Sequence, residues 1–328
     1  MVVDRMHRAA CLLAADGKDF LRPLDSGDFV ERHVGGVILN HMGWAAAIGV
    51  RCGIFGRQGG DDEGRFLRAA MDERCIARDI LVVDEPTSLS EIFVDDAGER
   101  AIYMASGATS ATTAEQVRQR HAHFIARAPV LTTEVSQLPL AAAGEALRIA
   151  RESGSETWVD FDVPPEVALA SLGDAGELDA VLRAADVLKP SKVAIAERLG
   201  AASGDGALEL ALAVRDQLGN PVVVVTDGER GCAIAAADFE GSVPARKVEP
   251  VDTTGAGDAF LGGLLAARTA GLGWADAGAF ANALGAVCVG QLGAFPLDPE
   301  ATREAVFALY DGPTRALRAL AERAKTAG

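Results

Sequence analysis

The sequence is poor in cysteine and lacks long apolar runs. Its 328 residues include only five cysteines, and no two of them form a CxxC pair. Neither a zinc site nor a framework of disulfides is indicated, so a reducing cytoplasm is the expected compartment. No apolar run is long enough to span a bilayer, and residues 1–20 lack the apolar core of a signal peptide. We therefore expect no membrane partner.

Basic residues are also scarce. The chain has 31 Lys and Arg against 47 Asp and Glu, a net charge of −16. Non-specific nucleic-acid binding requires clustered basic side chains, so we expect no nucleic-acid partner. Any anionic substrate needs a locally positive site, and the amides at a helix N-terminus supply one without basic residues.

Short Val, Ile and Leu runs alternate with Ala- and Leu-rich helical stretches along the chain. This alternation predicts an α/β fold, in which a mostly parallel sheet is covered by helices on both faces. The expected strands are 51–55, 128–133, 157–163, 186–190 and 221–226. The expected helices are 40–48, 63–74, 113–126, 139–152, 206–218, 259–270, 275–290 and 314–325.

Two stretches break this alternation. Residues 8–36 have the turn signals of a hairpin and little helical period, and residues 87–104 alternate apolar and polar positions around "DDAG", a stronger hairpin signal. We interpret both as a small β lid over the carboxyl edge of the main sheet, although they could also be ordinary decoration of a sheet edge. The large domain would then comprise residues 1–7, 37–86 and 105–328.

The stretch "VDTTGAGDAFLGGLLAAR" (251–268) places a glycine-rich loop directly before an apolar helix. It does not fit a GxGxxG dinucleotide motif, because the third position is Phe260, and it has no GK[ST] ending. The amides of Gly255–Gly257 can converge on one point at the helix N-terminus and form an anion hole. Asp258 is either a general base beside that hole or a helix cap.

Other segments resemble one known family. "VGGVILNHMGWAAAIG" (34–49), "GRQGGDDEGRFL" (56–67), "VVVTDGERGCAI" (223–234) and "ANALGAVCVGQLGAFP" (281–296), together with the loop at 252–258, resemble the motifs of the ribokinase-like (PfkB) carbohydrate kinases. The resemblance covers nearly the whole chain. It implies a three-layer α/β/α sandwich with a small antiparallel β lid, and phosphoryl transfer from MgATP to a primary hydroxyl of a sugar or nucleoside.

The resemblance also implies roles for individual residues. Asp258 matches the catalytic base, and the anion hole matches Gly255, Ala256 and Gly257. The substrate side matches Asp4, Gly35, Gly36, Asn40 and Glu134, although Asp4 and Glu134 could also be surface or capping acids. The nucleotide side matches Thr226, Gly228, Gly231 and Asn282. A loop that often binds a monovalent cation such as K⁺ matches Asp252 and Thr254.

Two features depart from the family pattern. Its usual Lys-Pro-Asn-x-x-Glu reads "LKPSKVAIAE" here, so Ser191 and Ala194 replace groups that organise magnesium. Glu197 follows one helical turn later and could bind Mg²⁺ through a water, while Lys192 is either a charge near the phosphates or a solvated lysine. The family's first strand ends at the position of Asp4, and most of that expected strand is absent from the sequence.

Three functions remain open. The leading hypothesis is an ATP-dependent sugar kinase; the second is a nucleoside kinase of the same fold; the third is a catalytically silent sugar- or nucleotide-binding protein, suggested by Ser191 and Ala194. The sequence does not identify the acceptor. Asp160 and Asp162 could face it or merely end a strand. Exposed strand edges in a lid are often covered by partners, so we also expect a homodimer through the lid.

Overall fold

The computed structural model describes residues 1–96, 100–201 and 204–325. The strands are β1 Val2–Arg8, β2 Glu31–Gly35, β3 Gly53–Gly59, β4 Ala77–Val83, β5 Leu89–Val94, β6 Arg100–Ala105, β7 Val130–Glu134, β8 Glu156–Phe161, β9 Val187–Pro190, β10 Val222–Thr226, β11 Cys232–Ala236 and β12 Phe239–Val243. The helices are α1 Val37–Ile48, α2 Asp62–Glu73, α3 Gly107–Ser110, α4 Ala114–Gln116, α5 Ala122–Ile125, α6 Leu140–Glu152, α7 Pro165–Ser171, α8 Ala175–Arg183, α9 Lys192–Leu199, α10 Ala207–Leu218, α11 Ala256–Thr269, α12 Trp274–Val289, α13 Pro299–Leu309 and α14 Arg315–Lys325.

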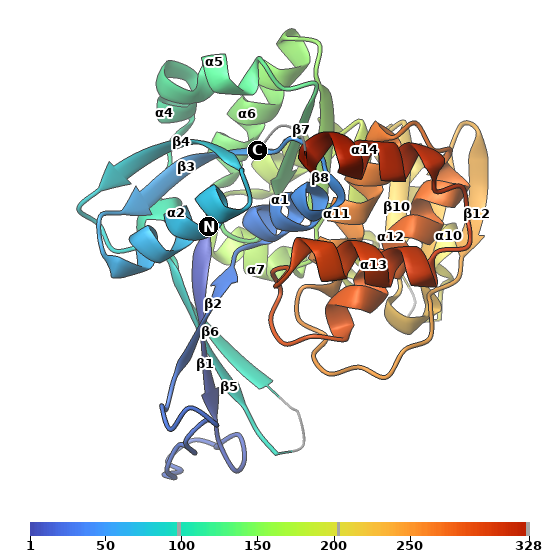
Figure 1. Cartoon of the computed structure of the whole chain (residues 1–328). Helices are drawn as coiled ribbons and strands as arrows, with labels where there is room; N and C mark the ends of the chain where they lie inside the picture. Colours follow the sequence, from blue (N-terminus) through green and yellow to red (C-terminus); the bar gives the residue numbers. More distant parts are fainter. Residues whose placement is uncertain (97–99, 202–203, 326–328) are drawn as a thin grey trace.

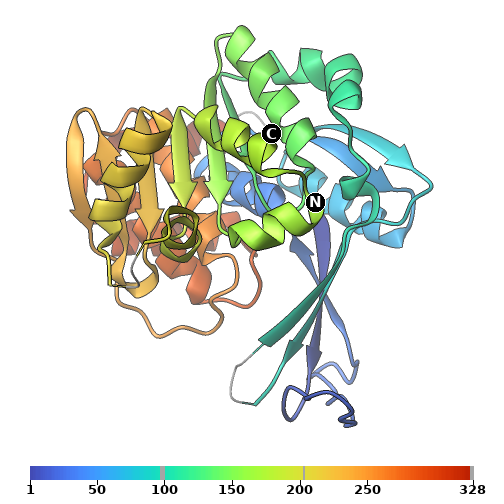
Figure 2. The same ribbon diagram turned by 180° about the vertical axis from the view of Figure 1, so that it is seen from behind.

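A six-stranded sheet of order β12-β11-β10-β9-β8-β7 forms the middle layer. Strands β7 to β10 are parallel, and β11 and β12 are antiparallel additions. Because side chains alternate across a strand, neighbouring residues enter different cores: Trp158 packs with α1, α11 and α12, whereas Val159 packs with α6, α8 and α10. Figures 1 and 2 show these two helical layers in front of and behind the sheet.

A four-stranded sheet of order β2-β1-β5-β6 projects from this body and forms the lid (Figure 1). Its β5–β6 pair is the hairpin expected from residues 87–104, although its tip at 97–99 lies outside the described residues. The sheet is mixed, because β1 pairs with β2 in antiparallel and with β5 in parallel. Strands β3 and β4 form a separate parallel pair beside α2.

Three expectations from the sequence need correction. The first strand does not end at Asp4 or belong to the main sheet: β1 continues to Arg8 and is an inner strand of the lid. Residues 8–36 do not make a hairpin of their own, because their main strand is β2 and its partner is β1. The helix expected at 113–126 is interrupted by a π-helical turn at Val117–His121.

The helices α1, α2, α6, α10, α11, α12 and α14 begin and end within three residues of the expected limits. Among the described residues, none of the helices is long and apolar enough to cross a membrane.

Candidate active site

The glycine loop turns directly into the N-terminus of α11. Gly255 is the N-cap residue and has a left-handed backbone with φ 76°. A Cβ at this position would lie 2.4 Å from the Cβ of Ala294, so the close approach also requires glycine. No side chain caps the first turn of α11, where helical amides have no partner within the helix. Free amides and the helix dipole favour an anion at such a position, so the anion hole expected at Gly255, Ala256 and Gly257 stays a prediction.

Asp258 is the third residue of α11 and therefore does not cap it. The residue is 8% exposed, and its carboxylate accepts a hydrogen bond of 2.7 Å from the side-chain amide of Asn40, on α1. The side-chain oxygen of Asn40 is buried and has no hydrogen-bond partner among the described residues. The structure thus brings together the expected base and one expected substrate residue, and leaves an acceptor oxygen beside them.

A buried charge cluster lies behind Asp258. The Nε2 atom of His41 is 3.1 Å from a carboxylate oxygen of Asp160 and 3.6 Å from one of Asp258. The ammonium of Lys189 donates hydrogen bonds of 2.9 and 3.0 Å to the two oxygens of Asp160. Burial disfavours the charge of Asp160, but Lys189 and His41 outweigh it and lower the pKa of this carboxyl.

On the acceptor side, Asp4 projects from β1 across Gly35 of β2. A Cβ on Gly35 would lie 2.2 Å from a carboxylate oxygen of Asp4, so only glycine leaves room for this side chain. Burial, with a smaller contribution from the charge of Asp258, raises the pKa of Asp4 to about 7. Gly36 has φ 93° and packs against the backbone of Met1 and Val2, which explains its glycine structurally.

Glu134 lies at the end of β7 and is 4% exposed. Its carboxylate accepts hydrogen bonds from the hydroxyl of Ser136 and from the amides of Gln137 and Leu138, both at 3.2 Å. Burial raises the pKa of Glu134. The structure therefore uses this carboxylate to hold the loop after β7.

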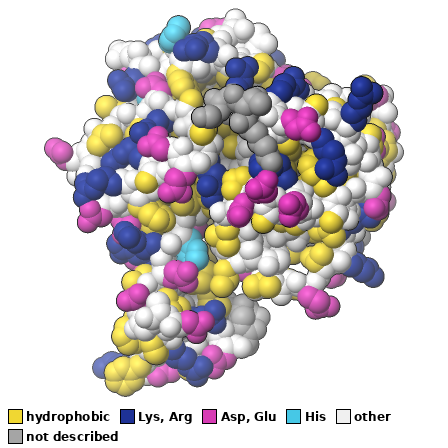
Figure 3. Space-filling model, in the orientation of Figure 1, with side chains coloured by type: hydrophobic (Ala, Val, Ile, Leu, Met, Phe, Trp, Pro, Cys, Tyr) yellow, Lys and Arg dark blue, Asp and Glu magenta, His cyan; other side chains and the backbone are white. Residues whose placement is uncertain are grey.

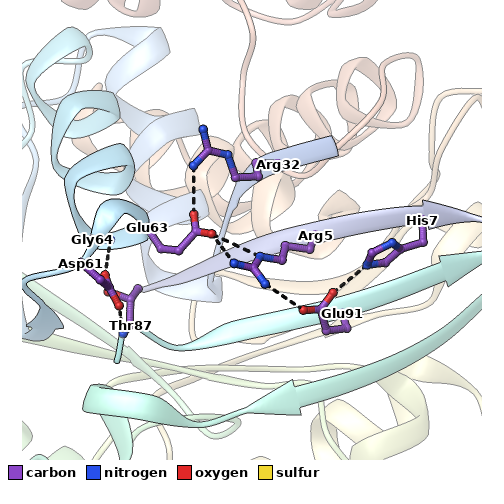
Figure 4. Close-up of polar contacts among 8 residues, drawn as sticks. All are labelled: Arg5, His7, Arg32, Asp61, Glu63, Gly64, Thr87 and Glu91. Carbon is purple, nitrogen blue, oxygen red and sulfur yellow. Dashed lines mark hydrogen bonds and ion pairs between the residues drawn. The ribbon is translucent and has the colours of Figure 1, made fainter. Parts of the chain in front are cut away.

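Ion pairs join the base of the lid to α2 (Figure 4). Arg5 of β1 bonds Glu63 of α2 at 3.2 Å and also Glu91 of β5 at 3.2 Å. Asp61, the N-cap residue of α2, accepts hydrogen bonds of 2.8 and 2.6 Å from the amide and hydroxyl of Thr87, just before β5. This network fixes the direction in which the lid leaves the body.

The residues expected on the nucleotide side shape the backbone. Thr226 ends β10, and its hydroxyl donates to the carbonyl of Pro190 at 3.4 Å. Gly228 and Gly231 have φ 54° and 95°, and a Cβ on Gly231 would lie 2.2 Å from the carbonyl oxygen of Val243. The side-chain amide of Asn282 donates to the carbonyls of Val243 and Pro244 at 3.0 and 3.2 Å. Asn282 therefore holds the segment that follows β12.

The expected cation ligands lie beside an arginine of the lid. One oxygen of Asp252 accepts the amide of Thr254 at 2.9 Å, and the other accepts the amide of Gly293 at 3.0 Å. Burial would raise the pKa of Asp252, but these hydrogen bonds lower it. Arg100 of β6 lies 3.7 Å from Asp252 and hydrogen-bonds the hydroxyl of Thr254. A guanidinium thus already supplies positive charge at this loop.

The segment after β9 differs from the family pattern in structure as well as in sequence. The hydroxyl of Ser191 accepts the amide of Ala194 at 3.2 Å and caps α9. Ala194 is fully buried, whereas Glu197 is exposed, so the structure does not bring Glu197 into the cluster around Asp258. Lys192 pairs with Asp227 at 3.6 Å.

Sequence reasoning missed His41 and Lys189. His41 directly follows Asn40, and Lys189 is the lysine of the segment "LKPSKVAIAE", but the sequence does not show that either side chain is buried against a carboxylate. For Asp160, the sequence leaves open whether the side chain faces the acceptor or merely ends a strand. The structure turns it toward His41 and Lys189.

Comparison with known proteins gives consistent likenesses. A family model described as pfkB family carbohydrate kinase matches residues 15–301. The chain is 30% identical to the aminoimidazole riboside kinase of Salmonella typhimurium over 277 residues, 81% of this chain and 84% of that one. It is 29% identical to an uncharacterized sugar kinase of Archaeoglobus fulgidus over 248 residues, 75% of this chain and 94% of that one.

A solved structure of Arabidopsis thaliana ribokinase, complexed with ribose and ATP, shares the fold. It superposes with a TM-score of 0.75 at 20% identity and covers 93% of this chain and 95% of that chain.

Proposed function

Since the chain belongs to the pfkB family of carbohydrate kinases, we propose that it phosphorylates the hydroxymethyl group of a small sugar or sugar derivative with ATP. The observation that supports this most directly is the place of Asp258. Asn40 holds the carboxylate of Asp258 by a hydrogen bond. Asp258 itself lies in the first turn of α11, where the amides after Gly255 have no side-chain cap. A base and an anion site therefore adjoin.

In the proposed reaction, the acceptor hydroxyl lies between Asp258 and the γ-phosphorus of ATP. Its oxygen forms the new P–O bond while Asp258 takes its proton, and the bond from phosphorus to the β-phosphate oxygen breaks with its electron pair leaving on ADP. The first-turn amides of α11 stabilise the charge on the transferring group. Asp4 and Asn40 form hydrogen bonds with other hydroxyls of the acceptor.

The residues after β9 do not fit direct magnesium ligation. Ala194 has no donor atom, and the hydroxyl of Ser191 is used in the cap of α9. Glu197 is exposed one turn away, so ligation through a water is the most that it could offer. We propose that Mg²⁺ arrives on the phosphates of ATP.

A second candidate is a nucleoside kinase. The relative named as an aminoimidazole riboside kinase, at 30% identity, favours it. The lid also exposes apolar side chains that could cover a base. They are Leu13, Phe20, Phe29, Ile102, Tyr103 and Met104.

The same apolar residues support the proposal of a homodimer through the lid. Figure 3 shows hydrophobic side chains gathered at the lower end of the lid. Phe20 is 91% exposed and Tyr103 is 67% exposed. Exposed apolar patches of this kind often mark protein interfaces. A monomeric mass in solution at micromolar concentration would contradict the dimer.

The function is tested by measuring ADP release with MgATP against sugars and nucleosides that carry a hydroxymethyl group, with and without potassium. We expect one acceptor to stimulate ADP release strongly, and Asp258→Asn to lower that turnover by roughly 10²–10⁴ while ATP still binds. A strong nucleoside response would select the second candidate. Ligand binding without any turnover would instead support a catalytically silent binding protein.

A further inference from the structure

The buried cluster around Asp258 contains one group that the proposed reaction does not use. His41 is fully buried on α1, directly after Asn40. Its Nε2 atom faces Asp160 of β8 at 3.1 Å and Asp258 of α11 at 3.6 Å. Its Nδ1 atom is buried without a hydrogen-bond partner among the described residues. Both carboxylates therefore face the same nitrogen of the imidazole, and the ring has no contact with solvent.

The charges around His41 show what it contributes. The cluster contains the carboxylates of Asp160 and Asp258, and the ammonium of Lys189 is bound to Asp160. Asp162, just after β8, is exposed and acts on Lys189 through its charge. A neutral imidazole would leave Asp160 and Asp258 with a single cation between them. A protonated one balances the two buried carboxylates.

The three groups His41, Asp160 and Asp258 also have the spacing of metal ligands. However, Lys189 already binds both oxygens of Asp160, so a metal ion there would face an ammonium at close range. A protonated His41 satisfies the same carboxylates without this repulsion. The cluster is better described as two ion pairs than as a metal site.

We propose that His41 is a positioning residue, an imidazolium that holds Asp258 in place and keeps it ionised when the phosphates of the nucleotide approach. This inference rests on the proposed kinase function, because it assigns Asp258 as the base. The triphosphate adds negative charge beside Asp258 and would favour protonation of its carboxylate. A fixed cation on the opposite side of that carboxylate counteracts this effect without contacting either substrate.

The electrostatic balance supports a charged His41. Burial lowers the pKa of His41, but the hydrogen bond to Asp160 and the charge of Asp258 outweigh it and raise the pKa to about 9. The partners of His41 come from two elements, Asp160 from β8 and Asp258 from α11, so its charge does not depend on a single contact.

The first test needs no activity. Nitrogen-resolved NMR of the uniformly labelled wild-type protein reports whether both nitrogens of His41 carry protons. We expect a doubly protonated ring at pH 7.5 and a changed His41 signal in Asp258→Asn. A neutral His41 ring at pH 7.5, or a signal that Asp258→Asn leaves unchanged, would overturn the proposal even if the protein were an active kinase.

The second test compares two buried histidines. His121 is also fully buried and pairs with a carboxylate, Asp79, at 2.8 Å, but it lies on the π-helical turn away from Asp258. We expect His41→Gln to move the acid limb of the kcat–pH profile upward by about one unit, with a small change in the KM of the acceptor. His121→Gln should leave the profile in place. An unchanged acid limb in a folded His41→Gln protein would overturn the positioning role of His41. Absence of wild-type turnover would instead overturn the proposed kinase function.

Discussion

The side-chain amide of Asn40 donates a hydrogen bond of 2.7 Å to the carboxylate of Asp258, although the two residues are 218 positions apart in sequence. It joins α1, which carries the proposed substrate residue Asn40, to α11, where we propose the anion site. The contact also explains why Asp258 does not cap α11, because its carboxylate is directed toward Asn40 on α1.

Replacing Asn40 by aspartate would place two carboxylates at hydrogen-bond distance. One of them would hold a proton, because two buried like charges raise the pKa of one member of the pair. We expect Asn40→Asp to lower kcat at pH 7 by roughly tenfold or more and to raise the acid limb of its pH profile. Asn282→Asp is the control: this side chain is also buried but bonds backbone carbonyls, so that limb should not move.

Gly255→Ala should impair the anion site. The left-handed backbone costs an L-residue about 1–2 kcal/mol, and the added Cβ would also collide with Ala294. We expect turnover to fall by roughly 10²–10³ as the amides shift. Gly219 has a similar φ of 81° but open space around it. Gly219→Ala should therefore lose only the backbone energy in urea unfolding and retain activity; equal losses of activity would contradict this account.

Arg100 bears on potassium dependence. Its guanidinium lies 3.7 Å from Asp252, where the family resemblance places a monovalent cation. We expect Arg100→Gln to make turnover more dependent on potassium, because the carboxylate loses its neighbouring cation. Activity would be compared in potassium chloride and in choline chloride at equal ionic strength. Arg22→Gln removes another lid arginine, paired with Asp96, and should not change the ratio.

His41 should also make stability depend on pH. Its pKa is raised from 6.5 to about 9 by folding, so its contribution of up to about 3 kcal/mol is complete below pH 6.5 and is lost as the pH rises through 9. We expect the difference in unfolding free energy between wild type and His41→Gln to be largest at pH 6 and to shrink by pH 9.5. A difference that stays constant with pH would mean that only packing was lost.

Lys189 should be far more important for stability than Lys192. Removing Lys189 leaves Asp160 buried without its ammonium, and breaking such a pair costs about 3–5 kcal/mol. Lys192 pairs with Asp227 nearer the surface, where an ion pair contributes about 1 kcal/mol or less. Urea unfolding of Lys189→Met and Lys192→Met measures both. Similar losses of unfolding free energy in the two variants would show that water reaches the cluster around Asp160 in spite of its burial.

Much of the fold was predictable because it follows from local patterns. The period of apolar residues located most long helices, and the family resemblance predicted the ribokinase-like sandwich with its lid, which the family match and the solved structure confirm. Strand partners were harder. The sequence between 1 and 8 does not say whether an extended segment joins the main sheet or the lid, because either environment accepts its alternating residues.

The site was predictable only in part, for a related reason. Gly255 and Asp258 belong to a continuous motif, so their positions can be read from the sequence. The roles of His41 and Lys189 depend on contacts with Asp160 and Asp258, which lie on other elements of the fold. The exposure of Glu197 likewise depends on how α9 packs, which the spacing to Ala194 does not determine.

The helices α1 and α11 approach each other closely at Gly262. A Cβ there would lie 2.7 Å from the Cβ of Trp44 and 2.9 Å from the carbonyl oxygen of His41. Because the two helices touch there, any bulk added to the inner face of α1 would displace α11 and, with it, Asp258. Engineering of a new acceptor range should therefore alter the lid strands around Asp4 and leave the two helices as they are.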